Sequence, residues 1–249
     1  MRVLLTNDDG IQSRGLRALA DALIAAGHRV TVCAPDRERS AASHSSIIGK
    51  PVHPVPVDFP GADRAWATDG TPVDCARVGV FLTRDESVDL VISGINRGMN
   101  LGGACVYSGT VGAALEAAMC GAQALAVSLV VDFHRQDEDY GPAARLAIRV
   151  AEWIKAHPLP RGCIYNLNLP PLPYDAIKGL VAAPLDPLFV ADALYRVEDG
   201  GYHYVFAESP LDVPDSDFKR VNDGYATITK LTWDMRLNAD DGELNGIGL

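Results

Sequence analysis

Along the first 160 residues, short apolar runs alternate with longer segments in which apolar residues recur every three or four positions. The opening predicts a strand over Arg2–Thr6, a helix over residues 13–26 that Gly27 ends, and a second strand over residues 28–34. The apolar positions of this helix form one face that can pack on a sheet. They are Leu16, Leu19, Ala20, Leu23 and Ile24. The opening is therefore a βαβ unit.

The same alternation continues further along the chain. Strands are predicted over residues 88–92 and 125–131, with a helix over residues 110–120 between them and another over residues 142–156. Strands that alternate with helices form a parallel sheet with right-handed crossovers, so we predict an α/β fold. Beyond about residue 186 the pattern is hairpin-like, around Asp199 and over residues 224–229, and predicts a β-rich C-terminal extension over residues 186–249. One α/β domain over residues 1–249 that carries this extension is a simpler interpretation than two domains.

Composition places the chain among globular proteins, with 48% hydrophobic and 22% charged residues in a length of 249. Its longest apolar runs, such as residues 124–131, are less than half the ~20 residues that cross a bilayer. Asn7 and Asp8 interrupt the opening before a signal sequence can form. The five cysteines are scattered and show no Cys-x-x-Cys spacing, which favours neither a disulfide framework nor a zinc site. We expect a cytoplasmic protein with no membrane partner.

The charge is negative and unevenly spread. A net charge of −10 argues against a nucleic-acid polymer as partner, because phosphate contacts call for clustered Lys and Arg. Residues 186–249 hold 13 acidic and 5 basic residues, which leaves 19 acidic and 17 basic in residues 1–185. An anionic substrate is therefore expected in the first part of the chain, with the help of a cation.

Polar loops follow three of the predicted strands, at the sheet edge where such folds bind ligands. The first loop, residues 7–10, reads Asn-Asp-Asp-Gly. The adjacent carboxylates of Asp8 and Asp9 repel each other where a buried strand ends, unless a hard cation such as Mg²⁺ or Mn²⁺ takes their oxygens. The alternative is a surface turn, because Asn, Asp and Gly are common turn residues.

The second loop, residues 34–45, is rich in hydroxyls and contains two arginines. Arg37 and Arg39 are candidates to hold a phosphate, and Ser40 can offer a neutral oxygen to a metal. The alternative is a solvated loop whose serines cap a helix. For His44 two interpretations stay open, a general acid or an exposed loop residue.

The third loop, residues 93–103, combines glycines with amide side chains. Asn96 and Asn100 offer oxygens to a cation or amide hydrogens to a phosphate, and a long ordered loop is more often functional than connecting. After it, Ser108 or Thr110 predicts a helix N-cap, and a helix N-terminus is an anion site. Close helix packing through Gly109 and Gly112 is the alternative. The chain has neither a Walker A loop nor Gly-x-Gly-x-x-Gly after the first strand, which argues against ATP and NAD.

In this order the segments resemble the survival protein SurE family of nucleotidases. The matching motifs are Thr6-Asn-Asp-Asp-Gly10, Ala34-Pro-Asp-x-x-x-Ser40, Gly70-Thr-Pro-x-Asp74, Ser93-Gly-Ile-Asn96 with Gly98 and Asn100, and Ser108-Gly-Thr110. The likeness is dense over residues 1 to about 130 and resumes at Asn166-Leu-Asn-Leu-Pro170 and Asp223-Gly-Tyr225. Residues 186–210 match weakly, so base preference and assembly carry over less safely than the chemistry.

The resemblance implies a Rossmann-like three-layer sandwich with a mostly parallel sheet. It also implies hydrolysis of nucleoside 5′- and 3′-monophosphates with one divalent metal ion, Mg²⁺ or Mn²⁺, per subunit. The family's metal ligands fall on Asp8, Asp9, Ser40 and Asn96, and its phosphate-side loop falls on Ser108, Gly109 and Thr110. Asp8, Asp9 and Asn96 are then the catalytic candidates. The tail resembles the part of the family used for subunit exchange, which implies a homodimer or homotetramer.

Three alternatives stay open from the sequence. Asp8 is the candidate for orienting or deprotonating a water molecule, and direct attack of its carboxylate on phosphorus, as in aspartyl-phosphate enzymes, is the alternative that the sequence leaves open. The opening βαβ unit also resembles the start of a nucleotide-sugar glycosyltransferase, although such enzymes need a second Rossmann half that 249 residues barely accommodate. A non-catalytic nucleotide-binding module is the third, and it would not need the adjacent carboxylates.

Overall fold

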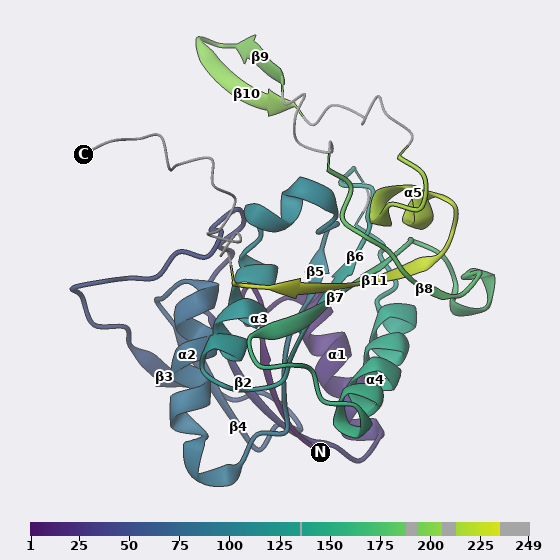
Figure 1. Ribbon diagram of the computed structural model, residues 1–249. Helices are drawn as coiled ribbons and strands as arrows, with labels where there is room; N and C mark the ends of the chain where they lie inside the picture. The colour runs from purple at the N-terminus through teal and green to yellow at the C-terminus, as the bar shows by residue number, and fades with distance from the viewer. Residues whose placement is uncertain (135, 188–193, 206–212, 235–249) are drawn as a thin grey trace, which may run out of the picture.

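The chain folds around a central sheet with helices on both faces (Figure 1). The computed structural model describes residues 1–134, 136–187, 194–205 and 213–234. Within these residues, nine strands form the main sheet in the order β3-β4-β2-β1-β5-β6-β7-β11-β8. They are β1 (Arg2–Thr6), β2 (Arg29–Pro35), β3 (Pro54–Pro56), β4 (Arg64–Thr68), β5 (Leu90–Arg97), β6 (Ala124–Leu129), β7 (Cys163–Leu169), β8 (Leu180–Ala182) and β11 (Ala226–Thr232). The run from β4 to β7 is parallel throughout, which confirms the predicted mostly parallel sheet.

Two helices cover each face of the sheet. The helices are α1 (Arg14–Ala25), α2 (Pro72–Leu82), α3 (Gly109–Met119), α4 (Gly141–Ala156) and the short α5 (Asp217–Asn222). Buried side chains of α1 and α4 share one hydrophobic core with the sheet, and those of α2 and α3 share another on the opposite face. These two cores make the three-layer sandwich, with the parallel strands buried between the helix layers.

The predicted opening is confirmed to within one or two residues. Ser13 caps α1 through its hydroxyl, and Leu16, Leu19 and Leu23 are fully buried against the sheet. Helix α2 was not predicted, although Thr71 and Asp74 form a capping box at its start. Its apolar residues are spread around the helix rather than along one stripe, so periodicity did not reveal it.

The C-terminal part divides between the main sheet and a separate hairpin. Residues 224–229 were predicted to be hairpin-like, and this was wrong, because β11 pairs with β7 antiparallel and with β8 parallel inside the main sheet. The hairpin predicted around Asp199 is present as β9 (Leu194–Glu198) and β10 (Gly201–Val205), which among the described strands pair with each other alone. Figure 1 shows this hairpin away from the body of the sheet. No helix among the described residues is long and apolar enough to cross a membrane.

Candidate active site

The loop after β1 forms a tight turn at the carboxyl edge of the sheet. The Asn7 side chain fastens this turn, since its Nδ2 donates to the Gly10 carbonyl at 2.9 Å and to Ser13 Oγ at 2.7 Å. Gly10 has a φ of +92°, and a Cβ there would lie 2.9 Å from the backbone of Arg37. The turn residues therefore hold the backbone of Asp8 and Asp9 in one position rather than lying on the surface.

Asp8 is buried against the N-terminus of α3. The Thr110 amide donates to Asp8 Oδ2 at 3.1 Å, and the Thr110 hydroxyl donates to Oδ1. A Cβ at position 109 would lie 2.9 Å from Asp8 Cβ, so Gly109 lets the helix end approach the carboxylate closely. Asp8, Gly109 and Thr110, which the sequence predicted to be site residues, thus meet in space although about 100 residues separate them.

Asp9 points toward the end of β5 and toward a cavity. The backbone amide of Arg97 donates to Asp9 Oδ2 at 2.9 Å, and the Arg97 guanidinium binds Glu138 Oε1 at 2.7 Å. The cavity has a volume of about 370 Å³. Its lining residues are Asp9, Gln12, Ser13, Arg14, Glu38, Arg97, Gln136, Glu138 and Tyr140. Asp9 is therefore the carboxylate of the pair that a bound molecule can reach from this cavity.

Burial and mutual repulsion disfavour the charged forms of the two carboxylates. Burial raises the pKa of Asp8 above its ordinary value. Burial, together with the charge of Asp8 beside it, raises the pKa of Asp9 to about 7. The negative charge of the nearby Glu38 also raises the pKa of both carboxyls. Two buried, mutually repelling carboxyls fit a hard divalent cation, which restores charge balance.

The neutral oxygens of Ser40 and Asn96 are positioned differently. The described residues contain no group of three or more His, Cys, Asp or Glu that could hold a metal, so a cation here needs neutral donors as well. The Asn96 Nδ2 donates to the Gly98 carbonyl at 3.0 Å, which leaves its Oδ1 for a cation. The exposed Ser40 hydroxyl donates to Glu38 Oε1 at 2.6 Å, which leaves the oxygen lone pairs of Ser40 as donors.

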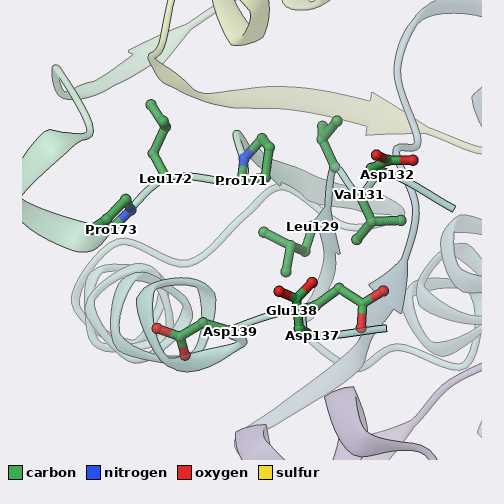
Figure 2. A pocket seen from close by; sticks show the side chains of 10 residues that line it. Leu129, Val131, Asp132, Asp137, Glu138, Asp139, Pro171, Leu172 and Pro173 are labelled. Carbon is green, nitrogen blue, oxygen red and sulfur yellow. The ribbon is translucent and has the colours of Figure 1, made fainter. Parts of the chain in front are cut away.

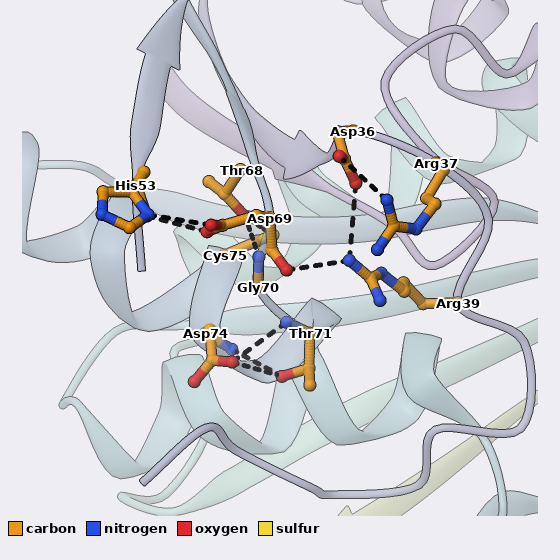
Figure 3. A network of polar contacts seen from close by, with 10 residues as sticks. All are labelled: Asp36, Arg37, Arg39, His53, Thr68, Asp69, Gly70, Thr71, Asp74 and Cys75. Carbon is orange, nitrogen blue, oxygen red and sulfur yellow. Dashed lines mark hydrogen bonds and ion pairs between the residues drawn. The ribbon is translucent and has the colours of Figure 1, made fainter. Parts of the chain in front are cut away.

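The second loop is anchored to Asp8 and to the start of α2. The Arg39 amide donates to the Asp8 carbonyl at 2.7 Å, which holds the neighbouring Ser40 next to the first loop. The Arg39 side chain binds the Asp69 carbonyl at 2.8 Å and lies 3.5 Å from Asp36, and Arg37 lies 3.5 Å from the same Asp36 carboxylate (Figure 3). The two arginines, which were candidates to hold a phosphate, thus take part in a polar network that joins the second loop to the segment before α2.

The far end of this loop is anchored to α3. His44 Nε2 lies 3.0 Å from Oε2 of the buried Glu116, which also pairs with Arg77. The Ser43 amide donates to the Tyr107 carbonyl at 2.9 Å. These contacts favour neither of the two interpretations given for His44. They indicate instead that the histidine fastens the loop to α3.

Asn100 belongs to the core of the third loop rather than to the open site. Its side-chain Nδ2 donates to Ser128 Oγ at 2.8 Å, and its backbone amide donates to Asn168 Oδ1 at 2.8 Å. Its carbonyl accepts from the side chains of Asn166 and Asn168. Asn100 is buried, so it connects the loop to β6 and β7 and does not face a ligand. The third loop itself starts later than predicted, because β5 continues to Arg97.

The N-terminus of α3 has one amide left for an anion. Ser108 is the N-cap, as its Oγ accepts from the Val111 amide at 3.0 Å, and its carbonyl accepts from the Gly112 amide. The Thr110 amide is engaged with Asp8. Among the first four amides of α3, that of Gly109 has no acceptor within the described part of the chain.

Two acidic residues of the site were not singled out from the sequence. Glu38 lies two positions before Ser40 in a loop already under consideration, so its place in that loop was the available signal. Glu138 carried no signal, because it lies in a loop of mixed polarity and becomes relevant through its contact with Arg97. Glu138 also lines a second cavity of about 340 Å³, between the ends of β6 and β7, shown in Figure 2.

Comparison with known proteins gives concordant matches. A family model described as survival protein SurE matches residues 3–187. The 5′-nucleotidase SurE of Synechococcus sp. (strain JA-3-3Ab) is 41% identical, with 100% of this chain and 98% of that protein covered. The 5′-nucleotidase SurE of Gloeobacter violaceus is 40% identical, with 94% and 91% covered. The crystal structure of the SurE protein from Aquifex aeolicus aligns with a TM-score of 0.81 at 31% identity, over 95% of each chain.

Proposed function

This chain belongs to the survival protein SurE family, and from that membership we propose that it is a 5′-nucleotidase, which hydrolyses nucleoside monophosphates to nucleoside and inorganic phosphate. The observation that carries the proposal is the placement of Asp8 against the N-terminus of α3, with the adjacent Asp9 facing the cavity. Two carboxylates next to an anion-binding helix end suit a phosphate ester held against a cation. Hydrolysis of 3′-monophosphates is part of the same proposal. Neither the glycosyltransferase nor the non-catalytic alternative finds support in the relatives.

We infer that one divalent cation, Mg²⁺ or Mn²⁺, binds per subunit through oxygens of Asp8, Asp9, Ser40 and Asn96. Support comes from the raised pKa of Asp8 and Asp9 and from the free oxygen positions of the two neutral residues. When bound, the cation would polarise a phosphoryl oxygen and acidify a water molecule. Of these four residues, Asp9 is the one that lines the described cavity.

The remaining groups of the site would hold the phosphate and the water. The Gly109 amide at the start of α3 and the side chain of Asn96 would donate to the phosphoryl oxygens, with Ser108 capping the helix that points at them. Asp8 would orient or deprotonate the water. Both of its oxygens already accept hydrogen bonds from Thr110, so we favour an orienting role over direct attack on phosphorus.

We also propose that residues 1–249 form one domain and that its extension, from about residue 186, contributes to a homodimer or homotetramer. A two-stranded hairpin by itself is marginal in water. The exposed Val197 and Tyr202 of β9 and β10 leave apolar surface on that hairpin. Packing against a second copy of the chain would bury this surface.

Phosphate release from a panel of nucleoside monophosphates, with Mg²⁺, Mn²⁺ or EDTA, tests the function directly. The proposal expects turnover with a divalent cation and loss of turnover with EDTA. A non-catalytic binding module would bind the nucleotides and release no phosphate. A glycosyltransferase would release a nucleoside diphosphate from nucleotide sugars and leave the monophosphates intact.

A further inference from the structure

Phe133 is an aromatic side chain next to the candidate site. The function proposed above assigns it no role. It lies in the loop between β6 and α4, and it is 64% exposed to solvent. A large apolar side chain that stays exposed gains nothing from burial in the folded chain. A ligand bound at the neighbouring site would cover this apolar surface.

The ring of Phe133 lies against the segment that carries Asn96. A Cβ at Gly98 would be 3.0 Å from Phe133 Cζ and 3.7 Å from Asn96 Nδ2, so the ring tip and the Asn96 amide lie on the same glycine. The φ of Gly98 is +129°, and the absent side chain makes room for the ring. Phe133 is thus fixed next to a residue proposed to contact phosphate and cation.

One face of the ring is already covered and held. The Arg97 guanidinium carbon lies over the ring, 5.2 Å from its centroid, and Glu138 holds that guanidinium at 2.7 Å. Arg14 fastens the same loop by donating to the carbonyls of Gln136 and Glu138 at 2.6 and 2.9 Å. With Arg97 on one face, the large exposed fraction of Phe133 belongs to the rest of the ring.

An exposed aromatic face next to a phosphate site matches the chemistry of a nucleotide. Every nucleobase has a flat π-face that stacks on aromatic side chains without sequence-specific hydrogen bonds. We propose that Phe133 is the stacking platform for the nucleobase and gives the enzyme its preference for nucleotides over phosphate esters that lack a base. This inference rests on the proposed nucleotidase function and adds the residue that recognises the base.

The test compares two substrates that differ in the base. Phosphate release from adenosine 5′-monophosphate and from ribose 5-phosphate is measured with Mn²⁺ for the full-length protein and its variants. Phe133→Ala should raise KM for the nucleotide about tenfold, a typical effect of losing a base–aromatic stack. Its kcat for the nucleotide and both constants for ribose 5-phosphate should stay within about twofold. Phe133→Trp should keep the low KM.

Phe81 offers a matched control. It is 61% exposed and lies under Arg84 at 4.1 Å, so it is a similar Phe–Arg pair. It sits near the C-terminal end of α2, while Pro72 at the other end of that helix approaches Gly109. Phe81→Ala should leave KM and kcat unchanged for both substrates. If Phe133→Ala disturbs folding, Phe133→Leu keeps the apolar contact with Gly98 and should still raise KM for the nucleotide alone.

Two results overturn the inference while the proposed function stands. One is an unchanged KM for the nucleotide in both Phe133→Ala and Phe133→Leu. The other is an equal rise in KM for both substrates, which would assign Phe133 to loop support. If the wild type releases phosphate from neither ester, the nucleotidase proposal fails, but this result does not yet decide the stacking role of Phe133. Equilibrium dialysis with adenosine 5′-monophosphate then decides the stacking role, since equal binding by wild type and Phe133→Ala would reject it and weaker binding by the variant would support it.

Discussion

Thr110 supplies both of its hydrogen-bond donors to the carboxylate of Asp8. Its amide lies 3.1 Å from Oδ2, and its hydroxyl donates to Oδ1. The contact joins the end of β1 to the first turn of α3 across 102 residues of sequence. It fixes the orientation of one carboxylate, while Asp9 faces the cavity. The adjacent acids therefore have different surroundings and different expected roles.

The Thr110 hydroxyl provides the first prediction. Thr110→Val keeps the amide and the volume but removes the donor to Oδ1, so Asp8 loses part of its orientation. We expect kcat for nucleoside monophosphates to fall about tenfold or more, in line with the loss of one hydrogen bond to a charged group. Thr110→Ser, which restores the hydroxyl, should retain most of the activity. Equal kcat for the valine and serine variants would contradict an orienting role of this hydroxyl.

The second prediction concerns the charge of Asp9. Asp9→Asn keeps the volume of a proposed cation ligand and removes its charge, so turnover should be nearly abolished. Isothermal titration calorimetry should show that Mn²⁺ binds more weakly to this variant than to wild type. The metal-free variant should melt at the same temperature as metal-free wild type or higher, because burial and the charge of Asp8 disfavour the Asp9 carboxylate. An active variant, or unchanged Mn²⁺ affinity, would remove Asp9 from the ligand set.

Asn96 and Asn100 should separate activity from stability. Asn96→Ala is expected to lower kcat with little change in the free energy of unfolding, because the one hydrogen bond of this side chain among the described residues is local, to the Gly98 carbonyl two positions away. Asn100→Ala leaves a buried Ser128 hydroxyl without its donor and should lower the free energy of unfolding by about 1–3 kcal/mol. Urea unfolding together with phosphate release distinguishes the two. The reverse pattern would mean that the third loop has been misinterpreted.

Glu116 predicts a pH-dependent contribution to stability. Burial by itself raises the pKa of Glu116, but the hydrogen bond from His44 and the charge of Arg77 outweigh it, so the pKa lies below its ordinary value of 4.5. A lowered carboxyl pKa stabilises the fold above pH 4.5, and that stability is lost as the pH falls through the lowered pKa. Glu116→Gln should therefore lower the free energy of unfolding by about 1 kcal/mol at pH 7, since the exposed Arg77 is screened. The urea midpoints of wild type and variant should converge as the pH falls. If the charge of Glu116 made no contribution, the difference between the two midpoints would be the same at every pH.

The last prediction tests the hairpin as an assembly element. A truncation after Pro184 would remove β11 from the main sheet, so it would disturb folding as well. Replacing residues 188–212 by a short Gly-Ser linker is feasible, because the Asp217 amide donates to the Pro184 carbonyl at 2.8 Å and the Asp186 amide donates to Asp217 Oδ1 at 2.8 Å. The ends of the excursion are therefore held side by side.

Light scattering on the full chain should give at least a dimer, and the linker variant should have a smaller subunit number while its circular dichroism spectrum keeps the helical signal, because the helices lie outside the replaced segment. A Val197→Ser, Tyr202→Ser double variant is the milder version, because it removes exposed apolar surface and keeps the hairpin backbone. An oligomer of unchanged size after the replacement would show that assembly uses another surface.

Local patterns predicted much of the α/β core and the loops that hold its site. The face of α1, the strand Arg2–Thr6 and the serine cap of α3 depend on neighbours a few residues away, and short-range rules describe such neighbours well. The doubly acidic loop and the Ser108 to Thr110 segment were recognised as candidates for the same reason. Strand β11 was misassigned, because nothing local distinguishes a hairpin strand from an antiparallel strand added to a distant sheet.

By itself, the sequence determined that Asp8 and Asp9 follow a buried strand and that a helix with small residues at its start follows the third loop. Only the tertiary structure decided what each group does. It assigned the Thr110 amide to Asp8 and not to an anion, placed Asn100 in the core, and fastened His44 to Glu116. These assignments depend on contacts between residues far apart in the chain. Hydrogen bonding and burial at such contacts are set by the packing of whole elements, which no short segment encodes.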